Sequence, residues 1–252
     1  MTGPVTLAWT GAPVVAHGVV ERTFVTSSRM VPGAMWRADG HADEQPLILL
    51  GHGGTEHKQS AGVRRIAAVL VAGGFTVAAI DGPMHGDRRP AAVADADDMA
   101  ATGAAYLDAI RGGDDAAVSA ADSMVRDWRE ALAALVGLPE LRSATVGYWG
   151  LSMGGRFGVP LLAEEPRIAA AVTGLVGTNA GSYILPAARR IEMPLLFIAM
   201  WDDELFPVAG AIELFAAMPA TDRRLHVFPG PHTGMPRDEE AVAVGFLRTR
   251  LL

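Results

Sequence analysis

The stretch Thr145-Val146-Gly147-Tyr148-Trp149-Gly150-Leu151-Ser152-Met153-Gly154-Gly155 decides how this sequence folds. It joins an apolar run to the pattern Gly-x-Ser-x-Gly, with Ser152 at its centre. The apolar run predicts a buried strand, and the residues that follow the serine predict a helix. A serine on a sharp turn between a strand and a helix projects its hydroxyl above the sheet. Glycines at 150 and 154 fit such a turn, because side chains there would collide with the neighbouring strand and the start of the helix.

Elsewhere, short apolar runs alternate with amphipathic, alanine-rich runs. This alternation predicts an α/β fold, in which helices flank a mostly parallel central sheet of about eight strands. No repeat and no low-complexity linker divides the sequence, so we predict a single domain over residues 1–252. The predicted strands are Val19–Val25, Val31–Arg37, Pro46–Leu50, Phe75–Ile80, Thr145–Trp149, Ile168–Leu175, Pro194–Trp201 and Arg224–Phe228. The predicted helices are Ala61–Ala72, Asp122–Leu135, Met153–Ala163 and Glu239–Leu252.

The segment 87–121 interrupts this alternation, because it is long and rich in alanine and aspartate. Connections of this length are uncommon unless they have structure or a function of their own. One interpretation is a solvated helical excursion. The other is a small helical lid beside the site, with an apolar face made of Met99, Tyr106, Leu107 and Ile110. The segment 175–193, after the sixth predicted strand, is too short for a large cap domain.

The composition argues against nucleic acid and membranes as binding partners. The chain has 252 residues, a formal net charge of −7 and no cluster of Lys and Arg, so we expect no nucleic-acid surface. No apolar stretch reaches the roughly 18 residues of a membrane span, and no secretory signal is predicted, so we expect a cytoplasmic protein without membrane contact. The absence of cysteine excludes disulfides and thiol catalysis.

A nucleophilic serine needs a base within hydrogen-bonding distance and an acid that orients the base. The predicted base is His232, because it lies in a Pro- and Gly-rich loop directly after the last predicted strand. His226 is the alternative, but it lies inside that strand. Three consecutive carboxylates follow the strand before it, and the residues alone leave the choice among them open: Asp202, Asp203 and Glu204.

Backbone N–H groups must also stabilise the oxyanion that develops on an attacked carbonyl. We predict one donor at Met153, directly after the serine, and the other in the loop after the third predicted strand. Gly54 is the first candidate there and Thr55 the second. The histidines of this region fit no metal-ligand spacing, so we predict no metal site. An apolar pocket wall is expected from Trp201, Phe206, Met153 and Met235, with Trp149 in the core.

Together these motifs resemble those of serine hydrolases in the α/β-hydrolase superfamily. The order Ser152, then an acid after the next strands, then His232 is the order of that superfamily. Family members commonly place the acid four residues before a proline such as Pro207, so the resemblance selects Asp203 over Asp202. The motifs that carry the resemblance are His52-Gly53-Gly54, Asp81-Gly82-Pro83-x-His85-Gly86, Gly150-Leu151-Ser152-Met153-Gly154, Asp203-Glu204-x-Phe206-Pro207 and Pro229-Gly230-Pro231-His232.

Within the superfamily, the strand Val31–Trp36 and the short connection after the sixth strand are most similar to the dienelactone-hydrolase-like and acetyl-xylan-esterase/peptidase-like branch. Dienelactone hydrolase itself uses a cysteine nucleophile, which this chain lacks. The resemblance therefore implies a carboxylesterase-like hydrolase that acts on a small-molecule ester through an acyl-enzyme and needs no cofactor. The alternatives are a thioesterase, a peptidase or amidase of the same fold, and a non-catalytic binder.

Overall fold

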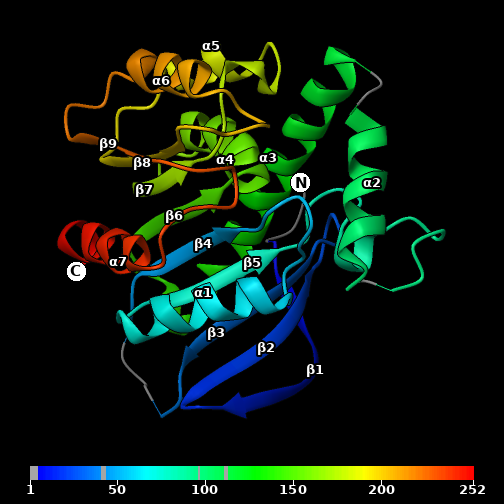
Figure 1. The fold of residues 1–252 in the computed structure, drawn as a ribbon. Helices are drawn as coiled ribbons and strands as arrows, with labels where there is room; N and C mark the ends of the chain where they lie inside the picture. Colours follow the sequence, from blue (N-terminus) through cyan, green and yellow to red (C-terminus); the bar gives the residue numbers. More distant parts are fainter. Residues whose placement is uncertain (1–4, 41–43, 96, 111–112) are drawn as a thin grey trace.

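The computed structural model describes residues 5–40, 44–95, 97–110 and 113–252, without the side chains of Met99 and residues 106–110. Its centre is an open sheet in the order β1-β2-β3-β5-β4-β6-β7-β8-β9 (Figure 1). The strands β4 to β9 are parallel, whereas β1, β2 and β3 run antiparallel to their neighbours. The bounds are β1 Leu7–Ala16, β2 Val19–Thr26, β3 Pro32–Ala38, β4 Leu47–Gly51, β5 Thr76–Ile80, β6 Val146–Leu151, β7 Ile168–Gly174, β8 Leu195–Met200 and β9 Arg223–Phe228.

All eight predicted strands are present, and the mostly parallel α/β fold is confirmed. The ninth strand, β1, was not predicted. It is an edge strand whose residues are mostly exposed, so its sequence lacks the apolar alternation of a half-buried strand. Gly11 and Pro13 interrupt it, and its pairing with β2 shifts register between Thr10 and Val14. Gly and Pro in such a run indicate a loop or an irregular edge, which is why the sequence pattern failed here.

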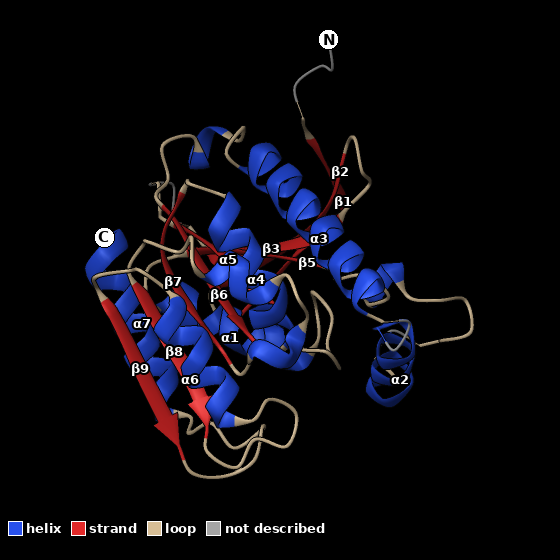
Figure 2. Cartoon of the chain, turned by 90° about the horizontal axis from the view of Figure 1, so that it is seen from above, coloured by secondary structure: helices blue, strands red, loops and turns tan. Residues whose placement is uncertain are grey.

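Helices cover both faces of the sheet (Figure 2). The helices α1 and α7 pack on one face, and α3, α4, α5 and α6 pack on the other. Two of these helices, α5 and α6, were not predicted, and α2 lies within the segment 87–121 that was expected to be helical. The bounds are α1 Ala61–Ala72, α2 Met99–Ile110, α3 Asp114–Leu135, α4 Met153–Glu164, α5 Ile184–Ala188, α6 Val208–Ala217 and α7 Asp238–Leu251, with short 3₁₀ turns at η1 Gly86–Arg88, η2 Pro139–Leu141 and η3 Thr178–Ala180.

The segment 87–121 contains most of η1, all of α2 and the first third of α3, and α2 lies at the margin of the molecule (Figures 1 and 2). The side chains predicted to form an apolar lid face, those of Met99, Tyr106, Leu107 and Ile110, lie outside the described part of the structure. The connection between β7 and β8 holds only η3 and α5, so the prediction of no large cap there is confirmed.

Ion pairs connect the start of the segment 87–121 to the rest of the fold. Lys58 is the sole lysine of the chain, and its Nζ contacts Asp81 Oδ2 at 2.8 Å and Asp87 Oδ2 at 2.6 Å. Arg88 contacts Asp127 of α3 at 2.7 Å. Lys58, Asp81 and Asp127 are buried, so each of these three charges stabilises the fold only while its partner is present.

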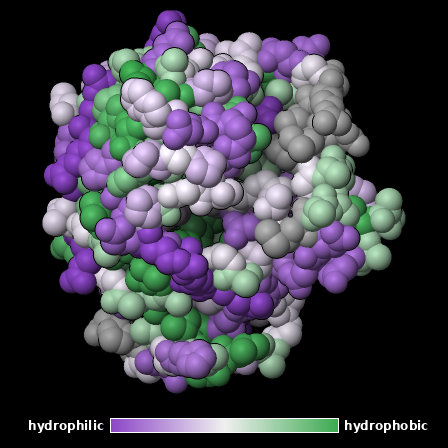
Figure 3. All heavy atoms as spheres, viewed as in Figure 1, coloured by the Kyte–Doolittle hydropathy of each residue, from purple (hydrophilic) through white to green (hydrophobic). Residues whose placement is uncertain are grey.

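The surface in Figure 3 mixes hydrophilic residues with small groups of hydrophobic ones. Across the described residues, no helix combines the length and the apolar character needed to cross a bilayer.

A carboxylate on β2 ties the antiparallel part of the sheet to the region around α1. Glu21 accepts hydrogen bonds from Trp36 Nε1 at 2.8 Å, Gln59 Nε2 at 2.6 Å and Arg64 Nε at 2.8 Å. Burial alone would raise the pKa of Glu21, but these donors, with Arg64 the strongest, lower the pKa to about 2. The ionised carboxylate therefore stabilises the folded state above the ordinary pKa of about 4.5, and this stabilisation is lost as the pH falls towards 2.

We expect Glu21→Gln to lower the free energy of unfolding at pH 7 by about 1–2 kcal/mol, after allowance for solvent screening. The deficit should shrink as the pH falls from 4.5 to 3, because the wild-type carboxyl then loses part of its own advantage. Urea unfolding at pH 7, 4 and 3 measures this difference. Glu140→Gln is the matched control, because its contact with Arg37 is solvent-exposed and long, at 3.8 Å. An equal deficit at pH 7 and pH 3 would contradict the prediction.

Candidate active site

The predicted turn around Ser152 is present and strained. Ser152 lies between β6 and α4 with φ 60° and ψ −119°, a conformation that a residue with a side chain rarely adopts. Such a backbone costs roughly 1–3 kcal/mol and persists only where the surroundings impose it. Here the Ser152 N–H donates to Gly174 O on β7 at 3.0 Å, which holds the turn against the sheet.

Two glycines allow this turn, as the sequence predicted. A Cβ on Gly154 would lie 2.6 Å from Gly51 O on β4, and a Cβ on Gly150 would lie 2.5 Å from the Tyr148 hydroxyl. That hydroxyl is buried and donates to Gly154 O at 2.7 Å, and its burial raises the pKa of Tyr148. The start of α4 therefore lies against the end of β4, so the loop after β4 is adjacent to Ser152.

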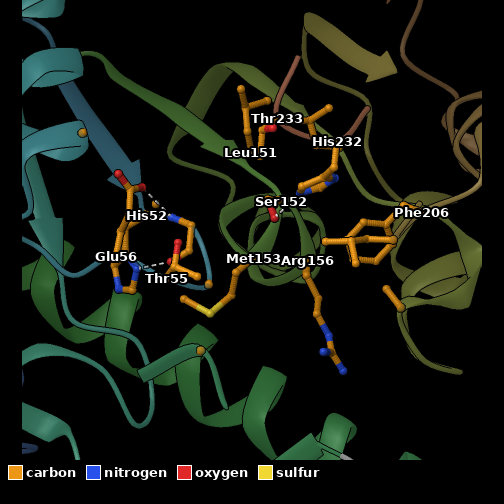
Figure 4. A pocket seen from close by; sticks show the side chains of 18 of the residues that line it. His52, Thr55, Glu56, Leu151, Ser152, Met153, Arg156, Phe206, His232 and Thr233 are labelled. Carbon is orange, nitrogen blue, oxygen red and sulfur yellow. Dashed lines mark hydrogen bonds between the residues drawn. The ribbon is translucent and has the colours of Figure 1, made fainter. Parts of the chain in front are cut away.

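The structure brings Ser152, His232 and Asp203 into one hydrogen-bonded chain, and Figure 4 shows the Ser152 and His232 side chains of this chain. His232 Nε2 lies 2.8 Å from Ser152 Oγ, and His232 Nδ1 lies 2.7 Å from Asp203 Oδ2. Because an ionised carboxylate only accepts, the Nδ1–H donates to Asp203 and Nε2 accepts from the serine hydroxyl. Asp203 and His232 are both buried, at 7% and 6% exposure, so water competes little for these bonds.

The three neighbouring carboxylates have different partners. Asp203 Oδ1 accepts the N–H groups of Leu205 and Phe206, both at 2.8 Å, which leaves Oδ2 directed at the imidazole. Asp202 instead accepts from Gly230 N at 2.9 Å. Glu204 accepts from the backbone N–H of His232 at 3.0 Å, and this bond lowers the pKa of Glu204. In this structure only the carboxylate of Asp203, among these three, contacts the His232 ring.

His226, the alternative base, lies elsewhere. Its Nδ1 is 2.6 Å from Glu239 Oε1 on α7, so the pair joins β9 to the closing helix. A strand histidine paired with a helix carboxylate has a packing role, in agreement with the preference for His232.

The loop after β4 is fixed by two buried histidines. His52 accepts the Gly82 N–H at Nε2, 2.9 Å away, and donates from Nδ1 to Gly53 O at 2.8 Å. Burial, with the neighbouring His85 ring, lowers the pKa of His52 to about 3, so His52 is neutral at pH 7. His85 Nε2 lies 2.9 Å from Gly54 O. These bonds fix the peptide groups of the loop in place beside Ser152.

The predicted oxyanion donors lie in this arrangement. The Gly53 N–H is occupied, because it donates to Glu56 Oε2 at 3.1 Å. The N–H groups of Gly54 and Thr55 make no hydrogen bond to another described residue. The same holds for Met153, the first residue of α4, whose N–H has no acceptor within its own helix. Both candidates in the loop therefore keep a donor that a ligand oxygen could use.

A cavity of about 830 Å³ contains these groups. Phe206 and Met235 line it, as predicted, and so does Met153. Trp201 does not line it: the residue follows the end of β8, its side chain is 61% exposed, and its predicted place in the wall was wrong. Trp149 of β6 is buried in the core, as predicted, and it also contributes to the cavity wall.

Sequence reasoning missed several other residues of the wall. Gly103 of α2 and Ala117 of α3 line the cavity, so the segment 87–121 borders the site. Two arginines, Arg65 of α1 and Arg156 of α4, also line it. The sequence spacing could have indicated Arg156, because it lies four residues after Ser152 and hence on the same helix face. Within the described residues, no three His, Cys, Asp or Glu side chains are grouped in a way that could hold a metal ion.

Comparison with known proteins identifies the family. No protein-family model and no curated protein matches the chain. Among solved structures, a cold-adapted esterase from an Arctic intertidal metagenomic library is 34% identical, with a TM-score of 0.79 and coverage of 97% of this chain and 100% of the other.

Two further structures show the same fold at lower identity. Acetyl xylan esterase 1 from a Thermoanaerobacterium species is 15% identical, with a TM-score of 0.68 and coverage of 98% and 88%. Dienelactone hydrolase from Anabaena variabilis is 18% identical, with a TM-score of 0.64 and coverage of 98% and 100%. The fold, the strand–Ser152–helix turn and a 34% identical esterase that covers nearly the whole chain agree: the protein belongs to the α/β-hydrolase superfamily.

Proposed function

We propose that the protein is a serine esterase that hydrolyses small-molecule carboxylic esters. The observation that carries this proposal is the hydrogen-bonded series Ser152, His232 and Asp203 at the wall of a large cavity. The 34% identical cold-adapted esterase supports the same reaction class. In this proposal Ser152 is the nucleophile, His232 the general base and acid, and Asp203 the residue that orients the imidazole.

In the first half of the reaction, Ser152 Oγ attacks the ester carbonyl carbon while His232 Nε2 takes the hydroxyl proton. The carbonyl oxygen becomes an oxyanion, which the N–H groups of Met153 and Gly54 stabilise. The tetrahedral intermediate then collapses: the carbon–oxygen bond to the alcohol breaks, and the His232 imidazolium gives its proton to the departing alkoxide. The products are a free alcohol and an acyl group on Ser152.

In the second half, water replaces the alcohol. The water oxygen attacks the acyl carbonyl carbon while His232 Nε2 takes a proton from the water. The N–H groups of Met153 and Gly54 stabilise the second oxyanion. Collapse of this intermediate returns the proton to Ser152 Oγ and releases the carboxylic acid. Asp203 stays ionised throughout and stabilises the imidazolium in both halves.

We expect the wild-type protein to hydrolyse 4-nitrophenyl esters in a series from acetate to dodecanoate, with an optimum at short to medium acyl chains. A cavity of about 830 Å³ accommodates a drug-sized ligand, whereas a long acyl chain would have to extend beyond it. Release of 4-nitrophenol measures kcat/KM for each ester. The matching thioester and anilide report the two alternative activities, and faster hydrolysis of either would replace the esterase assignment.

A further inference from the structure

The loop after β4 forms a tight turn over residues 53–56, beside Ser152. The Glu56 N–H donates to Gly53 O at 3.2 Å, which makes Gly54 and Thr55 the two central residues of a β-turn. The Glu56 carboxylate closes the same turn a second time, because its Oε2 accepts the Gly53 N–H at 3.1 Å. Glu56 therefore bonds both backbone polar groups of Gly53.

The carbonyl groups of this turn determine where its N–H groups point. In a trans peptide the N–H points away from the C=O of the same peptide unit. Gly53 O accepts from His52 Nδ1 at 2.8 Å and from the Glu56 N–H. The Gly54 N–H belongs to the same peptide unit as Gly53 O, so these two bonds direct it to the opposite side. This N–H is the first candidate for the second oxyanion donor.

Glycine at position 53 makes the turn dependent on these bonds. A residue without a side chain reaches a wider range of backbone angles than any other residue. The Glu56 carboxylate holds the peptide unit before Gly53, and His52 together with the Glu56 N–H holds the unit after it. Loss of the carboxylate would remove the first of these restraints, and the angles at Gly53 would then be set from one side only.

The start of α1 leaves room for the Glu56 side chain. A Cβ on Gly62, in the first turn of α1, would overlap Glu56 Oε1. A Cβ on Gly53 would lie 3.2 Å from Glu56 Oε2. One carboxylate oxygen therefore lies against α1 and the other against the turn. Glu56 and Gly62 both line the cavity, and Figure 4 shows Glu56 on the side of Ser152 away from Phe206.

We propose that Glu56 is a positioning residue for the oxyanion hole. Its carboxylate holds the backbone of Gly53 and thereby keeps the Gly54 N–H directed at the carbonyl oxygen of the ester. Donors that are already oriented stabilise an oxyanion most strongly, because they need not reorganise as the charge develops. Glu56 acts through Gly53 and Gly54, and the reacting atoms are contacted by the N–H group. This inference rests on the proposed esterase function and adds a residue to its machinery.

The first test compares two variants of Glu56 with 4-nitrophenyl butyrate as substrate. Glu56→Ala should lower kcat by about ten- to a hundredfold, because a poorly oriented donor loses part of what a donor contributes. KM should change by less than about threefold, since the oxyanion forms only after the substrate is bound. Glu56→Gln should keep kcat within about threefold of the wild type, because the amide oxygen can accept the same N–H.

A transition-state analogue provides a readout that a purely structural role would not change. A trifluoromethyl ketone adds to the serine hydroxyl and places an oxyanion where the ester would, so its Ki should rise in Glu56→Ala by the factor by which kcat falls. Glu44→Ala is the matched control. Glu44 also accepts one backbone N–H, that of Ser143, but it precedes β4 and so lies at the end of the strand away from the site.

Gly62→Ala tests the same contact with Glu56 still present. The added methyl group must displace the carboxylate, and the fold tolerates this because the carboxylate ends a flexible side chain. Alanine also favours a helix more than glycine does. We therefore expect an unchanged or higher melting temperature together with a fall in kcat similar to that in Glu56→Ala. Gly245→Ala in α7 is the matched control, because a Cβ there would lie in open space.

Four results would overturn the inference. They are full activity in Glu56→Ala, full activity in Gly62→Ala, an equal loss in Glu56→Gln and Glu56→Ala, and a fall in kcat without weaker inhibition by the ketone. A wild type that hydrolysed no ester would contradict the proposed function instead. The rate at which a fluorophosphonate labels Ser152 also depends on the oxyanion donors, so in that case equal labelling of the wild type and Glu56→Ala would overturn the inference separately.

Discussion

Replacement of Ser152 by alanine should lower kcat for 4-nitrophenyl butyrate by about five to six orders of magnitude. In the proposed mechanism Ser152 Oγ supplies the bond-forming electron pair, and no other hydroxyl contacts His232 Nε2 among the described residues. Loss of a nucleophile removes the whole acyl-transfer route, and only binding and oxyanion stabilisation remain. The fold should persist, because the contact made by Oγ is its hydrogen bond to His232, at 2.8 Å.

Two measurements check this result. Steady-state release of 4-nitrophenol gives kcat, and a fluorophosphonate probe should label the wild type on the peptide that contains Ser152 and should not label Ser152→Ala. Ser119→Ala is the control, because Ser119 is an exposed serine of α3 and lies away from the imidazole. Activity within a hundredfold of the wild type in Ser152→Ala would eliminate the triad mechanism, whatever the labelling shows.

The sequence was sufficient to place Ser152 and His232 side by side, because the position of each follows from the end of a strand. An apolar strand followed by glycines at 150 and 154 permits few backbones other than a sharp strand-to-helix turn, and the close approaches at both glycines bear this out. A histidine directly after the last parallel strand must lie at the same sheet edge as Ser152. In both cases the end of a parallel strand determines the position.

Side-chain direction one residue beyond a strand was not predictable in the same way. Trp201 follows β8. Its backbone N–H donates to Phe228 O, and its side chain is exposed to solvent. The side chain of Trp149, within β6, is buried and lines the cavity. Both tryptophans lie near strand ends in the sequence. Only the pleat and the exact end of each strand separate a wall residue from a surface residue.

The sequence pattern alone could not show which of three consecutive carboxylates contacts the His232 ring. Asp202, Asp203 and Glu204 are similar in charge and reach, and the turn after β8 decides which one meets the imidazole. The backbone N–H groups of Leu205 and Phe206 fix one oxygen of Asp203, and Gly230 holds Asp202 away. Asp203 was selected because related hydrolases place the acid four residues before a proline such as Pro207. Hydrophobic periodicity does not distinguish among the three carboxylates.

Asp203→Asn should lower kcat by about three to four orders of magnitude with little loss of stability. The asparagine oxygen can still accept from Leu205 and Phe206, so the amide N–H₂ would face His232 Nδ1. Nδ1 would then have to accept, which places the imidazole proton on Nε2, directed at Ser152. A base that already carries a proton on that nitrogen cannot take another from the serine, so the first step stops although every heavy atom stays in place.

Asp202→Asn is the matched comparison for the acid. Asp202 accepts only the Gly230 N–H among the described residues, and an amide oxygen can do the same, so we expect kcat within about threefold of the wild type. Parallel kcat measurements with thermal unfolding of both variants distinguish chemistry from folding. If Asp202→Asn lost as much activity as Asp203→Asn at unchanged stability, the acid assignment would be wrong. A selective loss in Asp203→Asn would instead tie catalysis to the tautomer of His232, which is the property that the 2.7 Å contact controls.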